Sequence, residues 1–153
     1  MKEGLTRRCI EIFNHFGINF TILTKGGMRA SRDFGLYKEG DAFATTLTFL
    51  DEAKSLEWEP GAASPQDRIA AVKLAHDMGI KTWISLEPVI DPEQSLEIIR
   101  QTAPWVDLFK VGKLNHSKLE KTIDWHKFAN DAKNLLENLG KPYYLKEDLR
   151  KFL

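Results

Sequence analysis

The sequence predicts an α/β fold in which parallel strands carry helices on one face. Segments with the composition of strands alternate with segments of helical periodicity along the whole chain, an order typical of parallel sheets with right-handed crossovers. Each predicted strand also divides into an apolar row and a more polar row, because successive side chains point to opposite faces. The apolar row suits a layer of helices, so the helices are expected on that face.

The first third of the chain predicts a helix, two strands and a short helical turn. Apolar residues recur at helical spacing over residues 5–16, and Gly17 is a suitable left-handed cap. Residues 18–24 form the first predicted strand, and residues 30–37 contain a helical turn. Residues 43–49 are rich in β-branched and aromatic side chains, which favours a second strand.

The remaining segments continue the alternation. Ser64 and Pro65 provide a cap and a first helical residue, and the helix that they start ends at Gly79. The segments that follow are a strand at 81–87 broken by Pro88, a helix beginning at Asp91-Pro92, a strand at 106–111, a helix at about 124–138, and a short strand at Tyr143-Tyr144.

Composition limits the class of protein. The 153 residues suit a single domain, 1–153, and 42% of them are hydrophobic, enough for a core. Lys plus Arg and Asp plus Glu both number 22, so the basic excess typical of nucleic-acid binders is missing. No apolar run is long enough to span a bilayer, which predicts no membrane partner. The single cysteine, Cys9, is ordinary for a cytoplasmic protein.

The polar rows of the strands predict a ligand-binding cavity. Their polar members fall near the carboxyl ends of the strands, where α/β folds bind ligands, and comprise Lys25, Thr46, Thr48, Ser85, Glu87 and Lys110. A second reading is that Glu87 and Lys110 on neighbouring strands form only a structural ion pair. Glu59 lies in a Trp-Glu-Pro-Gly loop between a strand and a helix, where active-site loops occur but where a simple turn is equally expected. The four histidines show no metal-ligand spacing.

Several motifs together resemble one enzyme family. They are Leu23-Thr24-Lys25, Thr45-Thr46-Leu47-Thr48, the segment EPGAASPQDR at 59–68, Gly79-Ile80, SLEPVI at 85–90, and KVGKLN at 110–115. From about Phe20 to Leu149 the chain resembles the C-terminal half of radical S-adenosylmethionine (SAM) proteins of the spore photoproduct lyase-like group, also called DNA repair photolyase-like. The resemblance implies a partial (β/α) barrel, half of a TIM-type barrel, and a lyase-like radical SAM activity in the cytoplasm.

The resemblance also implies cofactors and site residues. Family members hold a [4Fe–4S] cluster on a CxxxCxxC motif in their N-terminal half, and SAM binds the fourth iron. This chain has only Cys9, so the cluster is expected only through a missing N-terminal half, and no residue here is assigned as a metal ligand. By resemblance the cofactor-binding candidates are Thr24, Lys25, Thr46 and Thr48, and the substrate-side candidates are Glu59, Ser85, Glu87 and Lys110. No catalytic residue is assigned.

Three functions stay open from the sequence. The first is the cofactor- and substrate-lining portion of a radical SAM enzyme, inactive without its cluster-binding half. The second is a stand-alone binding module or subunit without radical chemistry. The third is an aldolase-like barrel lyase that uses Lys110 as a Schiff-base amine. Expected partners are the missing half, or a second copy paired through an exposed sheet edge. Nucleic acid is a partner by resemblance only, since the net charge is zero.

Overall fold

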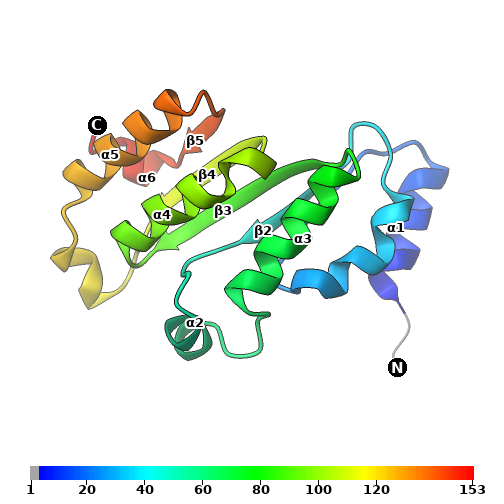
Figure 1. The fold of residues 1–153 in the computed structure, drawn as a ribbon, viewed down its shortest axis with the longest axis horizontal. Coiled ribbons are helices and arrows are strands. Elements are labelled where there is room, and N and C mark those ends of the chain that lie inside the picture. Colours follow the sequence, from blue (N-terminus) through cyan, green and yellow to red (C-terminus); the bar gives the residue numbers. More distant parts are fainter. Residues whose placement is uncertain (1–3) are drawn as a thin grey trace.

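A computed structural model describes residues 4–153 as a single twisted sheet with helices packed on one face (Figure 1). The five strands are all parallel and follow one another in the order β1-β2-β3-β4-β5. This architecture confirms the predicted α/β class and is consistent with a partial barrel. Among these residues no helix combines the length and the apolar character needed to cross a bilayer.

The predicted strands and main helices are present with some shifted ends, but the third strand continues through Pro88 instead of being broken there, and one short helix, at residues 52–58, was not predicted. In chain order they are α1 (Leu5–His15), β1 (Thr21–Thr24), the 3-10 segment η1 (Gly27–Leu36), β2 (Ala42–Thr46), α2 (Glu52–Trp58), α3 (Pro65–Asp77), β3 (Lys81–Val89), α4 (Pro92–Thr102), η2 (Ala103–Trp105), β4 (Leu108–Lys113), η3 (Lys118–Thr122), α5 (Trp125–Asn138), β5 (Tyr143–Leu145) and α6 (Glu147–Arg150).

Local chemistry explains where the main helices begin. Ser64 accepts a hydrogen bond from the backbone N–H of Asp67 (3.2 Å), and Pro65 is the first residue of α3, as the sequence predicts. Asp91 caps α4 in the same way through Gln94. Asp51 and Asp124 cap α2 and α5. In each of these helices, a side chain at the N-cap position therefore determines the residue at which the helix begins.

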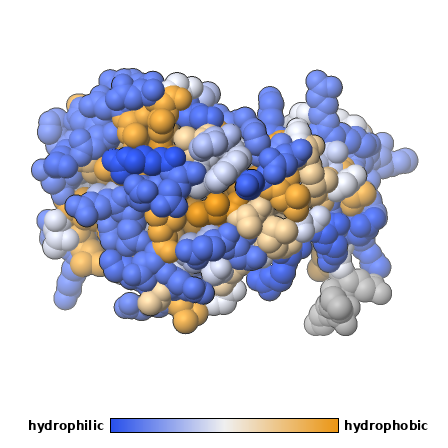
Figure 2. All heavy atoms as spheres, in the orientation of Figure 1, coloured by the Kyte–Doolittle hydropathy of each residue, from blue (hydrophilic) through white to orange (hydrophobic). Residues whose placement is uncertain are grey.

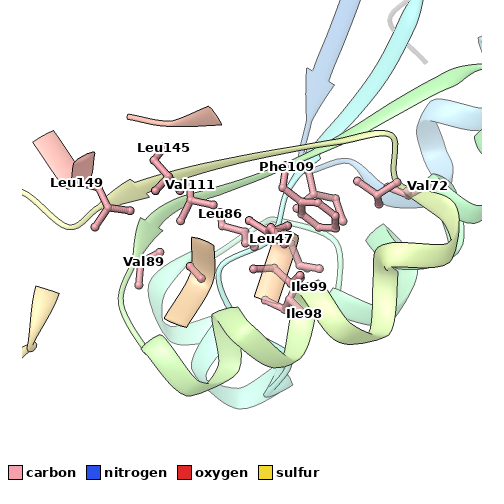
Figure 3. Close-up of a cluster of buried hydrophobic side chains, with 14 of the residues drawn as sticks. Leu47, Val72, Leu86, Val89, Ile98, Ile99, Phe109, Val111, Leu145 and Leu149 are labelled. Carbon is pink, nitrogen blue, oxygen red and sulfur yellow. The ribbon is translucent and has the colours of Figure 1, made fainter. Parts of the chain in front are cut away.

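The core lies between the sheet and the helices α3, α4 and α5 (Figure 3). The strands supply their apolar row, including Leu47, Ile84 and Phe109, all fully buried. The helices supply a matching stripe that includes Val72 and Ile98. On the helical side the surface is largely hydrophilic, with hydrophobic residues gathered along the middle (Figure 2). The predicted helix-facing row is therefore confirmed, and the opposite row faces away from the helices.

Candidate functional site

The register of the sheet brings the predicted polar residues onto the face opposite the helices, called here the open face. Thr46 is the register partner of Ser85, and Ser85 is the partner of Lys110, so these three side chains lie in one row across β2, β3 and β4. Glu87 lies over the backbone of Gly112, because a Cβ atom placed on that glycine would come within 3.1 Å of the Glu87 side chain. Lys25 follows β1 with the same alternation.

Small polar side chains occupy the middle of the open face. Thr46, Thr48 and Ser85 are all buried between larger neighbours. The Oγ1 atom of Thr48 is buried and has no hydrogen-bond partner among the described residues. A buried hydroxyl without a hydrogen-bond partner costs free energy. Thr48 thus retains a free donor and acceptor at the carboxyl end of the sheet.

Thr24 differs from the other predicted cofactor residues. Its side chain belongs to the helix-facing row, since it is the register partner of Thr45. The hydroxyl accepts a hydrogen bond from the backbone N–H of Gly26 at 3.0 Å, which shapes the turn after β1. Thr24 nevertheless lines, with Lys25, a groove of about 390 Å³ whose other walls include Arg29, Trp58 and Gly61.

The alternative reading, in which Glu87 and Lys110 form a structural ion pair, is wrong. Glu87 pairs instead with Lys146, whose Nζ atom lies 2.5 Å from its Oε2 atom. The ammonium of Lys110 lies over the ring of Trp83, 3.9 Å from the ring centre, a cation–π contact. The reason is that Lys146 directly follows the short strand β5, whose register places it next to Gly112 of β4, and the Glu87 side chain lies over the same glycine.

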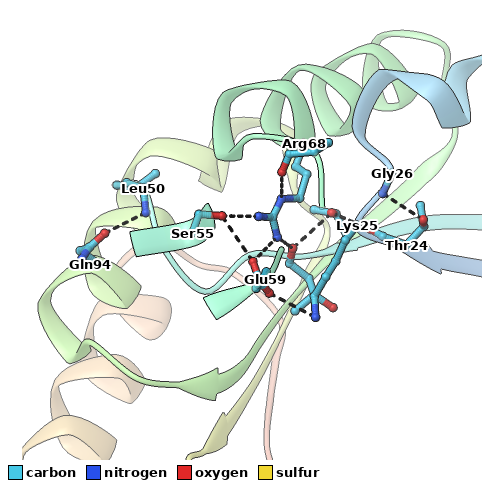
Figure 4. Close-up of polar contacts among 11 residues, drawn as sticks. Thr24, Lys25, Gly26, Leu50, Ser55, Glu59, Arg68 and Gln94 are labelled. Carbon is cyan, nitrogen blue, oxygen red and sulfur yellow. Dashed lines mark hydrogen bonds and ion pairs between the residues drawn. The ribbon is translucent and has the colours of Figure 1, made fainter. Parts of the chain in front are cut away.

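Glu59 lies in a buried network at the carboxyl ends of β1 and β2 (Figure 4). Its Oε2 atom is 2.7 Å from Nη1 of Arg68, and its Oε1 atom is 3.1 Å from Nζ of Lys25. Ser55 adds a longer contact of 3.5 Å to Oε2. The side chain of Glu59 is only 8% exposed, whereas that of Lys25 is 43% exposed. The network therefore joins a buried carboxylate to an accessible ammonium.

Arg68 is the buried centre of this network, and sequence reasoning missed it. The residue is 0% exposed and donates to the carbonyl oxygens of Ala63 and Thr46 (both 2.9 Å) and to Oγ of Ser55 (2.6 Å). A signal was present, because Arg68 occupies the same stripe of α3 as Val72 and Ala75, at positions i, i+4 and i+7. An arginine in an apolar stripe needs buried partners.

The described residues do not fit an iron–sulfur cluster. Cys9 is exposed on α1, and residues 4–153 contain no group of three or more His, Cys, Asp or Glu side chains placed to hold a metal ion. A [4Fe–4S] cluster needs several thiolates. A separate cavity of about 820 Å³ lies between α4 and α5, on the helical side, and none of the predicted site residues lines it.

The chain resembles solved structures in fold although not in sequence. No protein-family model and no curated protein matches it. Streptococcus suis SuiB bound to S-adenosylmethionine matches with a TM-score of 0.70 and 14% identity, covering 92% of this chain and 36% of SuiB. A second crystal structure of S. suis SuiB matches with a TM-score of 0.70 and 15% identity, covering 92% of this chain and 35% of SuiB. SuiB bound to precursor peptide SuiA matches with a TM-score of 0.72 and 15% identity, covering 92% of this chain and 34% of SuiB.

These matches establish a shared fold. The chain spans about a third of the length of the SuiB chains.

Proposed function

We propose that this chain is the cofactor- and substrate-lining portion of a radical SAM enzyme of the spore photoproduct lyase-like group. The observation that carries the proposal is the convergence of charged and hydroxyl side chains from consecutive parallel strands on one open face. Ligands bind at this end of the strands in α/β folds. The radical SAM-like fold shared with SuiB agrees with the sequence motifs, which are independent of it.

The β1–β2 end of the open face suits the cofactor. Lys25 presents an ammonium that is accessible and chemically matched to the carboxylate of SAM. Thr46 lies next to Lys25 by register, and the buried hydroxyl of Thr48, two residues further along the chain, lacks a partner among the described residues. Thr24 contributes by fixing the turn that carries Lys25 rather than through a free hydroxyl.

The β3–β5 end suits the substrate, with Ser85 and Lys110 paired in the middle of β3 and β4 and Glu87 nearer the carboxyl end of β3. Glu59 was placed with this group by sequence, but both of its carboxylate oxygens are engaged by neighbouring cations. Because the thiolates for a cluster are missing from residues 4–153, the radical chemistry itself requires a second polypeptide segment that carries CxxxCxxC. Such a segment would pair along β1, which is an edge strand.

The alternatives are weaker on specific grounds. A Schiff-base role needs the Nζ atom of Lys110 to project toward a ligand, whereas it lies over the ring of Trp83. A nucleic-acid partner finds no support in the zero net charge. A stand-alone binding module without radical chemistry would use the same open face, and the cluster-bearing segment distinguishes it from the enzyme.

Titration of the ¹⁵N-labelled chain with SAM tests the proposal. Amide signals around Lys25, Thr46 and Thr48 should shift with a Kd in the millimolar range or below, near −4 kcal/mol or stronger. Lys25→Met should weaken binding, while Lys81→Met should not, because Lys81 lies on the same strand face as Ser85 but at the amino end of β3. Shifts confined to the helical side, or none at all, would refute the proposal.

A further inference from the structure

We propose that Glu59 and Arg68 are positioning residues, which hold the ammonium of Lys25 at the carboxyl end of the sheet. The importance of Lys25 for a ligand rests on the proposed function, whereas the positioning itself rests on the contacts. Lys25 would then meet its anionic ligand group with its side chain already ordered. Glu59 would not contact substrate.

The carboxylate of Glu59 is fully used by its neighbours. One oxygen faces Lys25 at 3.1 Å, and the other faces Arg68 at 2.7 Å. With 8% of its side chain exposed and a cation facing each oxygen, Glu59 presents little free surface to the groove that it lines with Lys25. The carboxylate of Glu59 therefore links the exposed ammonium of Lys25 to the buried guanidinium of Arg68.

Arg68 fixes that bridge to the rigid parts of the fold. Its guanidinium bonds to the carbonyl oxygen of Thr46 at the end of β2, to that of Ala63 before α3, and to the hydroxyl of Ser55 in α2. A planar guanidinium with its donors committed in several directions has little freedom. The position of Glu59 is therefore set by one strand and two helices.

The backbone of Lys25 is tied to the same loop. Its carbonyl oxygen accepts a hydrogen bond from the N–H of Ala63 at 2.9 Å, next to the Arg68 contact. The turn after Lys25 also packs tightly on α3. The N–H of Met28 donates to Asp67 at 3.1 Å, and Gly27 has a φ of +57° with no room for a Cβ beside Asp67. Both ends of Lys25 are thus held by residues 59–67.

The charges indicate what the held ammonium would attract. Arg68 and Lys25 each carry a positive charge, and Glu59 carries one negative charge. The cluster of these three residues therefore has a net charge of +1. Lys25 is its exposed member, at 43% of its side chain. A preordered cation loses less entropy on binding than a free lysine does, which strengthens binding of a carboxylate.

The test compares Glu59→Gln and Arg68→Lys with the control Glu57→Gln, which removes the same charge from an exposed neighbour on α2. The first readout is the pair of Hε protons of Lys25, which differ in chemical shift when the side chain is held. We expect the two signals to converge in Glu59→Gln and Arg68→Lys and to stay distinct in Glu57→Gln. The second readout is SAM titration, where we expect affinity about tenfold weaker in the first two variants.

Each outcome decides a separate point. If the Lys25 signals of Glu59→Gln match those of the wild type, the positioning is refuted whatever SAM does. If the signals converge but SAM affinity is unchanged, the inferred role in binding is refuted. If the wild type binds no SAM, the proposed function fails, and the Lys25 signals alone decide the positioning. Should Arg68→Lys not fold, Glu59→Gln carries the test, because glutamine fills the same volume and still accepts from Arg68.

Discussion

Replacing Arg68 by methionine should destabilise the fold strongly. Methionine fills much of the space of the arginine stem, but it leaves the carbonyls of Ala63 and Thr46 and one oxygen of Glu59 without their donor. Removing one partner of a buried pair costs about 3–5 kcal/mol. Because Lys25 still faces the other oxygen of Glu59, we expect the lower end, about 3 kcal/mol.

A double-mutant cycle separates the charge from the packing. In Arg68→Met/Glu59→Gln a neutral amide replaces the carboxylate. The double variant should therefore lose about 1–2 kcal/mol less stability than the sum of the two single losses. Urea unfolding followed by circular dichroism measures all four proteins, with the slope checked for constancy. A loss below about 1 kcal/mol for Arg68→Met, or strict additivity in the cycle, would refute the buried network as described.

Three further predictions concern the whole chain. Anaerobic reconstitution should load no stoichiometric cluster on the monomer, since Cys9 is its only thiol; iron and sulfide analysis giving a stoichiometric cluster would contradict this. The chain should self-associate through the edge strand β1, and light scattering should show less association for Leu23→Lys (Leu23 is 48% exposed) than for Leu56→Lys on α2; a clean wild-type monomer at high concentration counts against it. Hydrogen bonds from Arg32 lower the pKa of Asp33, against an opposing effect of burial, so this stabilisation is complete above the unfolded pKa of about 4 and is lost as pH falls through the lower folded value. Asp33→Asn should flatten the acid limb of stability, whereas Asp77→Asn on the surface of α3 should leave it unchanged.

Features with a local cause could be predicted from sequence. The starts of α3 and α4 depend on Ser64 and Asp91, whose side chains each accept a hydrogen bond from the backbone N–H three residues ahead. The face on which Ile84 or Ser85 lies follows from alternation along one strand. Both rules act within a few residues, so no knowledge of the remaining chain was needed.

The helix α2 could not be predicted, for a physical reason. It is short, only Ser55 among its residues is buried, and Leu56 is 66% exposed, so it has no apolar stripe for periodicity to reveal. Its start is nevertheless capped by Asp51, which accepts from the N–H of Lys54 at 2.9 Å. The cap alone was too weak a signal in a segment that otherwise resembles a loop.

The choice of ionic partner for each charge was also beyond the sequence. Glu87 and Lys110 lie on adjacent strands, and the alternation of side chains places both on the open face. Glu87 nevertheless pairs with Lys146, and Lys110 lies over Trp83. The partner of Glu87 depends on β5, a strand of three residues, and on a register irregularity between Leu86 and Val89 in β3. Long side chains choose partners from the three-dimensional arrangement, which alternation does not determine.

The two ends of the open face differ in how deeply their ion pairs are buried, and this difference affects which ligand each end suits. At the β1–β2 end, Arg68 and Glu59 are buried and joined to strand, loop and helix. At the β3–β5 end, Glu87 and Lys146 form an ion pair in which 32% and 41% of the side chains are exposed, and such exposed pairs contribute little stability. A cofactor that every turnover requires gains from a preordered site, whereas an exposed pair is readily broken by an incoming polar group. This asymmetry supports placing SAM at the β1–β2 end and substrate at the β3–β5 end.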